Sequence, residues 1–319
     1  MDDSRAPSNV DERCPRAVLG AESEATLTAP SGWVAIVNPR SGGRSRSDEL
    51  MQRLHDAMSR VLVSERPGHV DELVRSCRDA EGIVVAGGDG TLFEVLQALD
   101  RARQKIALVP AGRGNSLARD LDVTPDCDAC ECITRGKDRS IDLLDVTLQY
   151  EDGRSWHGVS ASNLAIGYPA GVAAGASRWR RFGAGSYAVA AATTRIQSMD
   201  LHVQCDDGPE QPARVTGLIV SNSRYVGPFL GFPSSVPDDG VFHTIEMHAG
   251  TVGQVMHNLS SISGLGFYEP GVRKDLRAIA VRLDRPSLLK IDGELHTGVR
   301  KMQVRVLPRA VTFRVPAHA

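Results

Sequence analysis

The amino-acid sequence predicts an α/β protein in which a domain with a parallel sheet is followed by an antiparallel β-sandwich. Three observations predict this fold class. Up to about residue 146, short apolar runs alternate with segments of helical period, the order that places parallel strands beside crossover helices. Glycine-rich turns follow three of those runs. Beyond residue 146, strand-like runs dominate to the end of the chain.

Composition and charge narrow the class of protein. With 319 residues, 41% of them hydrophobic and 24% charged, the chain is typical of a globular protein with room for two domains. The formal net charge of -2 provides no overall basic field, so we expect no nucleic-acid partner. No apolar run reaches the roughly 18 residues of a spanning helix. Because the N-terminus also lacks a secretion signal, we expect a cytoplasmic protein.

The predicted N-terminal domain covers residues 31–146, after a polar segment at 1–30 that we expect to be a disordered tail. Its first buried strand is Trp33–Val37, which leads into the glycine-bearing turn Asn38–Gly43. The segments that follow are a helix over about 50–61, a strand at 61–63, a helix at 69–80, a strand at 83–86, a helix from about 91 to 103, a strand at 106–110, and a glycine-rich turn at 111–119 that opens another helix.

The three glycine-rich turns all leave the carboxyl ends of predicted parallel strands, so they should gather along one edge of the sheet. A helix N-terminus with free backbone N–H groups binds phosphate. Asp89 in the turn Gly87–Thr91 would repel phosphate unless Mg²⁺ or its water shell lay between them. Taken alone, that turn also fits an ordinary strand-to-helix turn with Asp89 as the helix cap. The convergence of three turns favours a nucleotide pocket.

The second domain is predicted at 147–319, and whether its last strands return to the first domain is left open. Helical patterns are few, at roughly 183–197 and 252–263. The predicted strands are 143–150, 156–166, 199–205, 214–221, 241–247, 277–284, 287–291, 303–307 and 311–315.

At this point a series of motifs resembles the catalytic family of diacylglycerol kinases, which also contains sphingosine kinases, ceramide kinases and bacterial lipid kinases. The resemblance covers about residues 33–316. The turn Gly87–Thr91 alone is shared with NAD kinases and phosphofructokinases, and the full series is more specific. The motifs are Asn38–Gly42, Gly87–Thr91, Pro110–Asn115, Ile141–Leu143, Asn222–Gly227, Pro237–Gly240 and Ile291–Glu294.

The resemblance implies an α/β nucleotide-binding domain of the NAD kinase and diacylglycerol kinase type, joined to a β-sandwich, with the active site in the cleft between them. It implies transfer of the γ-phosphoryl group of ATP to the hydroxyl of a diacylglycerol-like or sphingosine-like lipid, with Mg²⁺. Asp292 and Glu294 match the positions of the base, and Asp89 would organise the Mg²⁺. Asp239, with the carbonyls of Val236 and Val241, resembles a structural Mg²⁺ site. The positions implied to bind ATP are Asn38, Pro39, Arg40, Ser41, Gly42, Gly87, Gly88, Asp89, Gly90, Thr91, Glu94, Gly112, Arg113 and Asn115.

Other interpretations of these residues stay open. Asp292–Glu294 and Pro237–Gly240 also fit plain β-turns. Two positions depart from the family: Ser116 stands where many diacylglycerol kinases have Asp, and Pro169 replaces an Asp beside the acceptor pocket. The identity of the lipid is therefore open. The alternatives to a lipid kinase are an NAD kinase-like enzyme with a soluble acceptor and a non-catalytic nucleotide or lipid sensor.

The remaining features of the sequence bear on membrane contact, metal binding and the oligomeric state. Arg178–Phe182 mixes cations with aromatic residues, which fits transient contact of a peripheral enzyme with a membrane surface, although a solvated loop explains it as well. Cys127, Cys130 and Cys132 are close in sequence but lack a second ligand pair at zinc spacing, which favours free thiols. The oligomeric state stays open, and a homodimer is one arrangement that the sequence allows.

Overall fold

The computed structural model describes residues 31–319, except for 42–43, 113, 126, 179–184, 227–229, 232–234 and 249–271. Several predictions lie outside the described residues: the disordered tail at 1–30, the helix at 252–263, and Trp179–Phe182 of the basic and aromatic segment. Of the predicted site residues, Gly42 and Arg113 also lie outside them. In the described part of the chain, no helix is both long and apolar enough to cross a membrane.

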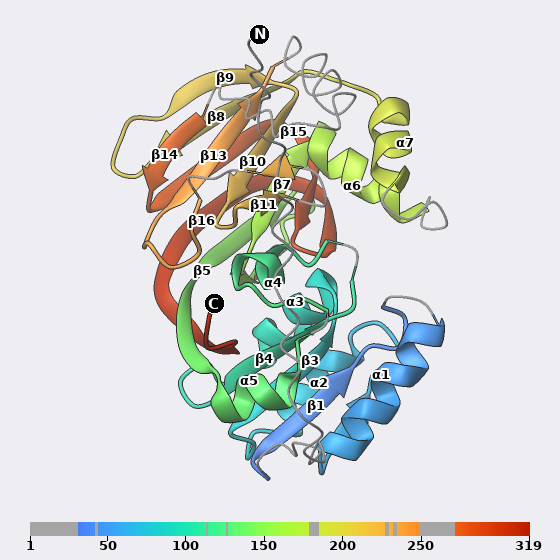
Figure 1. Cartoon of the computed structure of the whole chain (residues 1–319). Helices are drawn as coiled ribbons and strands as arrows, with labels where there is room; N and C mark the ends of the chain where they lie inside the picture. Colours follow the sequence, from blue (N-terminus) through green and yellow to red (C-terminus); the bar gives the residue numbers. More distant parts are fainter. Residues whose placement is uncertain are drawn as a thin grey trace, which may run out of the picture.

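The N-terminal part contains the predicted parallel sheet, with strands in the order β2-β1-β3-β4 (Figure 1). Helices follow the strands as crossover connections, as the alternating pattern predicts. The elements of this part are β1 (Trp33–Val37), α1 (Arg44–Ala57), β2 (Val61–Val63), α2 (His69–Arg75), β3 (Gly82–Gly87), α3 (Asp89–Ala98), β4 (Lys105–Pro110), α4 (Ser116–Asp120) and α5 (Ala129–Arg135).

Both faces of this sheet are covered, as the side chains of β3 show. Ile83 and Val85 belong to a buried cluster shared with α2 and α3, whereas Val84 and Ala86 belong to one shared with α1 and α5. All four side chains are at most 2% exposed. A strand buried on both faces has no polar face, which explains why β3 reads as an unbroken apolar run.

The C-terminal part is an antiparallel sandwich, as predicted. One layer contains β9-β8-β15-β16-β5-β6, and the other contains β14-β13-β10-β7-β15. Side chains from both layers meet in one buried cluster. The elements of this part are β5 (Lys137–Tyr150), β6 (Ser155–Ser160), β7 (Asn163–Gly167), α6 (Tyr168–Arg178), α7 (Gly185–Thr193), β8 (Met199–Cys205), β9 (Gln211–Val215), β10 (Gly217–Ser221), β11 (Tyr225–Val226), β12 (Leu230–Gly231), β13 (Phe242–Met247), β14 (Val272–Leu276), β15 (Ala278–Ile291) and β16 (Glu294–Val315).

Strands β15 and β16 are longer than predicted. The expected strands 277–284 and 287–291 form one strand, β15, with an irregular register between Arg282 and Ser287. This irregularity lets the first half of β15 pair with β8 and the second half with β7, so β15 belongs to both layers. Likewise, the expected strands 303–307 and 311–315 are parts of β16.

Two segments that were each predicted as one strand form two strands. The expected strand 156–166 is β6 and β7 with a tight connection between them, and 214–221 is β9 and β10. Helix α6 was not predicted, because its small residues give a weak helical pattern. The predicted helix at 183–197 corresponds to α7. The predicted domain boundary at residue 146 falls inside the continuous strand β5.

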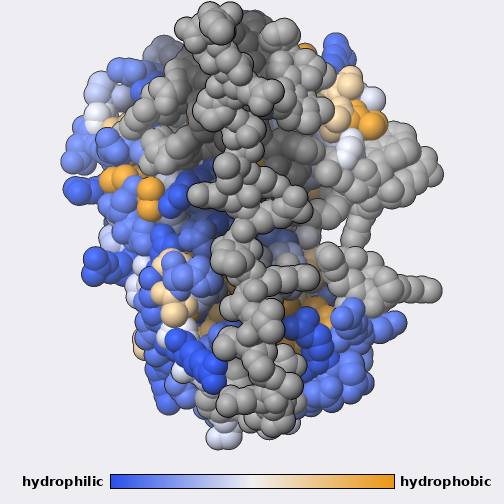
Figure 2. Space-filling view, in the orientation of Figure 1, coloured by the Kyte–Doolittle hydropathy of each residue, from blue (hydrophilic) through white to orange (hydrophobic). Residues whose placement is uncertain are grey.

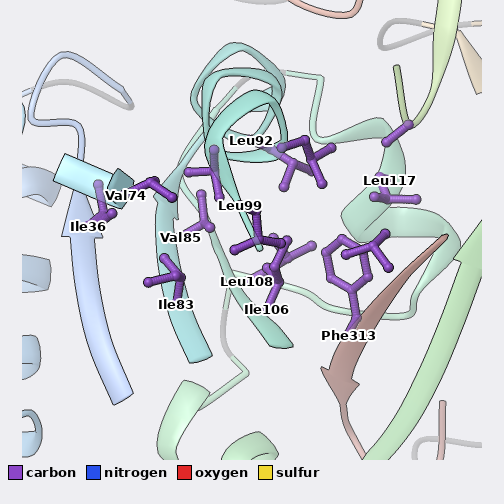
Figure 3. Close-up of a cluster of buried hydrophobic side chains, with 14 of the residues drawn as sticks. Ile36, Val74, Ile83, Val85, Leu92, Leu99, Ile106, Leu108, Leu117 and Phe313 are labelled. Carbon is purple, nitrogen blue, oxygen red and sulfur yellow. The ribbon is translucent and has the colours of Figure 1, made fainter. Parts of the chain in front are cut away.

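Strand β16 connects the two parts of the molecule. Along its 22 residues it pairs with β15 and β5 in the sandwich and then, through Phe313 and Arg314, in parallel with β4 of the first sheet. Phe313 is fully buried in the cluster of the first sheet. Figure 3 shows its ring beside the labelled Leu108, Ile106 and Leu117. The end of the chain thus completes the core of the N-terminal part.

We expect Phe313→Ala to lower the free energy of unfolding by about 3–5 kcal/mol, because it leaves a cavity where β16 meets β4. Gln303→Ala, at an exposed position of the same strand, should change it by less than about 0.5 kcal/mol. Urea denaturation followed by circular dichroism measures both. Equal small effects would show that the return of β16 contributes little to stability.

Candidate functional site

A cleft of about 430 Å³ lies where the glycine-rich loops meet the turn between β15 and β16. This volume is within the range of about 300–1,000 Å³ that small-molecule sites usually have. The predicted residues that line the cleft are Asn38, Arg40, Ser41, Gly88, Asp89, Gly90, Glu94, Gly112 and Asp292. Pro39, Gly87, Thr91, Asn115 and Glu294 are neighbours of these residues along the chain.

The first loop is attached to the second by Asn38, which follows β1. Its side-chain Nδ2 donates to Oγ1 of Thr91 at 3.0 Å, and its Oδ1 accepts the backbone N–H of Arg40 at 3.0 Å. Arg40 in turn donates from Nη2 to the carbonyl of Glu65 at 2.7 Å, beyond the end of β2. The side chain of Asn38 therefore fixes the loops relative to each other.

The second and third loops touch through glycine backbones. A Cβ atom on Gly112 would lie 2.5 Å from Cα of Gly88, a distance that real contacts do not reach. Asn115, with a φ of 46°, closes the third loop because its Oδ1 accepts the N–H of Gly112 and its Nδ2 donates to the Gly112 carbonyl. These glycines are thus required for packing of one loop on another, as well as for the approach of a ligand.

Asp89 is the first residue of α3 and is half-buried. Its Oδ1 accepts the N–H of Ser116 at 2.8 Å, and Gly114 leaves room for Oδ2 because a Cβ there would lie 2.6 Å from it. Burial is the strongest influence on the pKa of Asp89 and raises it, while the charge of Lys290 and the N–H of Ser116 lower it. Ser116, one of the departures from the family, therefore serves Asp89 through its backbone.

The fourth part of the rim is the turn between β15 and β16. A Cβ on Gly293 would overlap Cα of Gly90 and lie 2.7 Å from its nitrogen, so only glycine lets this turn approach the start of α3. Asp292, at the same turn, has a φ of 44° and is 5% exposed. This contact brings the Asp-Gly-Glu motif to the glycine-rich loops, about 200 residues away in the sequence.

The carboxylate of Asp292 is occupied by hydrogen-bond donors of the protein and is not available to act as a base. It accepts the backbone N–H groups of Ala161, Ser162 and Asn163 at 3.0, 3.1 and 2.9 Å, and the hydroxyl of Ser160 at 3.0 Å. Burial raises the pKa of Asp292, and these donors lower it. Asp292 therefore holds the connection between β6 and β7 against the β15–β16 turn.

Glu94 and Glu294 lie near each other at the side of the cleft. Burial raises the pKa of both carboxyls, and the negative charge of Glu294 raises that of Glu94 further. Glu94 is bound by the backbone N–H groups of Gly68 and Val70 at the start of α2, while its buried Oε2 has no hydrogen-bond partner among the described residues. The carboxylate of Glu294 accepts no hydrogen bond from any of the described residues. Of the two acids of the Asp-Gly-Glu motif, Glu294 is therefore the one with an available carboxylate.

The proposed structural metal ligands lie in a separate turn between β12 and β13. Asp239 is exposed, and its Oδ1 accepts the N–H of Val241 at 3.1 Å. Burial and the nearby Asp142 raise its pKa, with the effect of burial larger. No cluster of three or more His, Cys, Asp or Glu side chains suited to a metal occurs in the described part of the chain. Metal binding by Asp239, Val236 and Val241 stays a prediction.

Two other predictions concern Pro169 and the cysteines. Pro169 lies in the first turn of α6 and packs against Gly217 of β10, so it belongs to the start of a helix. Cys130 and Cys132 are buried on α5, and Cys127 is half-buried, with all three as free thiols. Burial raises the pKa of Cys132 to about 11, which keeps this thiol protonated at neutral pH.

Several residues of the cleft were not found from the sequence: Ser64, Arg66, Pro67, Ala173, Tyr187 and Lys290. Ser64, Arg66 and Pro67 follow β2. The carboxyl end of this predicted strand lies at the same edge of the sheet as those of β1, β3 and β4. Applying the edge rule to this strand would have found them. Lys290 gave no comparable pattern, since it lies inside a strand.

A second group of charges joins the parts of the molecule beside the third loop. The carboxylate of Asp120, at the end of α4, is 2% exposed and accepts the hydroxyl of Ser223 and the N–H of Arg224. Burial raises the pKa of Asp120 to about 6, although these donors lower it. The Asn222 side chain nearby donates to the carbonyls of Asp142 and Ala161 at 3.0 and 3.1 Å. The Asn222–Gly227 motif thus anchors the loops to each other.

Comparison with known proteins agrees with this arrangement. Residues 32–146 match the model of the diacylglycerol kinase catalytic domain. "Probable lipid kinase YegS-like" from Stenotrophomonas maltophilia is 25% identical over 311 residues, which cover 91% of this chain and 98% of that protein. Human sphingosine kinase 2 is 30% identical over 150 residues, or 38% of this chain and 22% of the human protein.

A solved structure of a diacylglycerol kinase from Bacillus anthracis has the same fold. It superposes with a TM-score of 0.70 at 17% sequence identity, covering 90% of this chain and 98% of that one. The two-part arrangement that the sequence predicts, with a parallel sheet and an antiparallel sandwich, is therefore confirmed.

Gly293→Ala should separate the β15–β16 turn from α3, because the added Cβ would overlap the backbone of Gly90. We expect it to reduce nucleotide binding at least about tenfold, which corresponds to about 1.4 kcal/mol. Gly185→Ala is the control, because its Cβ would enter open space. Titration of each variant with ATP measures the effect, and an unchanged Kd for Gly293→Ala would show that the contact is dispensable.

The raised pKa of Asp120 makes stability depend on pH in a defined direction. Because the folded state holds this proton up to about pH 6, the contribution of Asp120 to stability is present below its unfolded pKa of about 3.9 and is lost as the pH rises through about 6. The free energy of unfolding of the wild type, relative to Asp120→Asn, should therefore fall by about 2 kcal/mol between about pH 4 and pH 7. Urea denaturation at several pH values tests this, and a difference independent of pH would contradict it.

Proposed function

We propose that this chain transfers the γ-phosphoryl group of ATP to a hydroxyl group of a lipid, with Mg²⁺. The match of residues 32–146 to the model of the diacylglycerol kinase catalytic domain supports the proposal. One observation carries this proposal. Three glycine-rich loops and the Asp-Gly-Glu turn, which are far apart in the sequence, line one cleft through the contact of Gly90 with Gly293.

The loops supply what a nucleotide phosphate requires. Gly88 precedes the N-terminus of α3, and Gly112 and Gly114 add backbone without side chains on the facing wall. A helix N-terminus and exposed N–H groups favour negative charge. The polar side chains of Asn38 and Asn115 are bound to neighbouring loops, so the loops keep their shape before a nucleotide arrives.

The residues present also suit Mg²⁺. A magnesium ion usually takes one or two carboxylates, together with waters and substrate phosphates, and does not need an all-protein cage. Asp89 lines the cleft beside the loops and provides such a carboxylate. When bound, the ion would neutralise charge on the phosphates. The absence of a three-ligand cluster in the described part of the chain is compatible with this type of site.

The reaction also needs an acceptor for one proton. The hydroxyl oxygen of the lipid forms a bond to the γ-phosphorus, the bond from that phosphorus to the β–γ bridging oxygen breaks, ADP leaves, and the hydroxyl proton passes to a base. We assign this base to Glu294, because its carboxylate accepts no hydrogen bond among the described residues and partial desolvation raises its pKa. Asp292 is a positioning residue, since donors already surround its carboxylate.

The lipid acceptor is supported by two helices of the C-terminal part that reach the cleft. Ala173 of α6 and Tyr187 of α7 line the cleft there. Both helices consist largely of small apolar residues. In Figure 2 most of the surface that carries a hydropathy colour is hydrophilic, and a group of hydrophobic residues lies at the upper right, where Figure 1 shows α7. An acyl or alkyl chain of the acceptor would be favoured along this side.

The test is incubation with γ-labelled ATP and one acceptor at a time: diacylglycerol, sphingosine, ceramide or NAD, each with and without Mg²⁺. We expect label in a lipid, dependent on Mg²⁺, and none in NAD. Label in NAD alone would replace the lipid acceptor with a soluble one. Binding of ATP without transfer to any acceptor would favour a nucleotide sensor.

Glu294→Gln should lower kcat by about 10²–10⁴-fold, the usual contribution of a general base, with little change in the KM for ATP. The control is Glu131→Gln, on the exposed side of α5. Initial rates of phosphoryl transfer at saturating substrate measure kcat. An undiminished kcat for Glu294→Gln would transfer the role of base to Asp89 or Glu94, two carboxylates that line the cleft.

A further inference from the structure

Lys290 places a positive charge inside the cleft, and no motif or comparison assigns it a role. It lies near the end of β15, paired with Ala165 of β7 and Leu295 of β16. Its neighbours Leu289 and Ile291 are fully buried in the core of the sandwich. Since side chains alternate along a strand, Lys290 projects from the opposite face, which at this position forms a wall of the cleft.

The position is costly for a lysine. Removal of the ammonium group from water lowers its pKa, and only the nearby charges of Asp89 and Asp292 act in the other direction. An apolar side chain would avoid this cost. A charged group kept at this position at such a cost is expected to have a function beyond the stability of the fold.

The contacts of Lys290 within the protein do not account for its charge. Its Nζ donates to the backbone carbonyl of Asp292. The carboxylate of Asp292 is already bound by four donors from residues 160–163. Among the described residues, Lys290 makes no ion pair within 4.0 Å. An ammonium group has three N–H donors, so donors remain for a group in the cleft.

The other cations of the cleft are engaged elsewhere. Arg66 binds both carboxylate oxygens of Glu72 at 2.6 and 2.7 Å. Arg40 donates to the carbonyl of Glu65. The acidic side chains Asp89 and Glu94 line the same cleft and repel an anion. Lys290 lies on the side of the β15–β16 turn, and its charge lowers the pKa of Asp89.

We propose that Lys290 binds the terminal phosphate of the nucleotide and stabilises the charge on the phosphoryl group during its transfer. This inference rests on the proposed function, because it presumes that the glycine-rich loops hold the inner phosphates. It deepens that function by naming a catalytic residue on the sandwich side of the cleft. A compact ammonium suits this task, since it acts on phosphate as a point charge and fits between two backbones.

The test compares binding of ATP and ADP with the rate of transfer in wild type, Lys290→Met and Lys290→Gln. We expect Lys290→Met to raise the Kd of ATP about tenfold and that of ADP less than about twofold, because only ATP carries the phosphate that Lys290 would contact. kcat should fall by more than about 100-fold, since the charge also acts in the transition state. Lys301→Met, at an exposed position of β16, is the matched control and should behave as the wild type.

Each outcome decides between the roles. Equal weakening of ATP and ADP, or unchanged ATP binding and kcat in both Lys290 variants, would overturn the inference. If Lys290→Met does not fold, judged by circular dichroism, the ratio of ATP to ADP affinity in Lys290→Gln is decisive in the same way. A wild type that binds ATP but transfers no phosphoryl group would instead contradict the proposed function. The ratio of ATP to ADP affinity in the Lys290 variants would still test the contact of Lys290 with the terminal phosphate.

Discussion

The path of β16 is the constraint on which the rest of the structure depends. The strand begins at Glu294 beside the nucleotide loops, pairs with β15 and β5 through the sandwich, and ends in parallel pairing with β4. Both of its ends are therefore tied to the first sheet, one through the contact of Gly293 with Gly90 and the other through Phe313 in the core. A cleft between two parts joined in this way is held at both sides, and its walls have a defined separation before any ligand binds.

The cleft shows how polar groups are divided between holding the site and acting in it. Asn38, Asn115 and Asp292 have their side chains bound to neighbouring loops. Those interactions leave glycine backbone, Asp89, Glu94 and Lys290 on the surface of the cleft. Carboxylates and an ammonium group share a partly dehydrated space, where each charge acts more strongly than in water. The phosphates of a bound nucleotide would face the ammonium group, and a divalent cation would face the carboxylates.

The N-terminal sheet could be predicted well because its signal is local. Strands β1, β3 and β4 are buried on both faces and read as apolar runs, and each is followed by a turn and a helix whose order implies parallel pairing. The sandwich was harder. Bulges in β15 and β16 bend long strands without ending them, and a bulge has no reliable mark in the sequence because it depends on which partners the strand meets on either side.

The sequence by itself determined the fold class, the gathering of three glycine-rich loops at one sheet edge, and the family motifs, since hydrophobic period and turn chemistry act over a few neighbouring residues. Only the tertiary structure decided what those residues do there. It placed the carboxylate of Asp292 among backbone donors and left that of Glu294 open, and it set Lys290 facing Asp89. The roles of such side chains depend on the direction in which each one points and on the burial created by segments remote in the chain, and neither quantity is written in a local pattern.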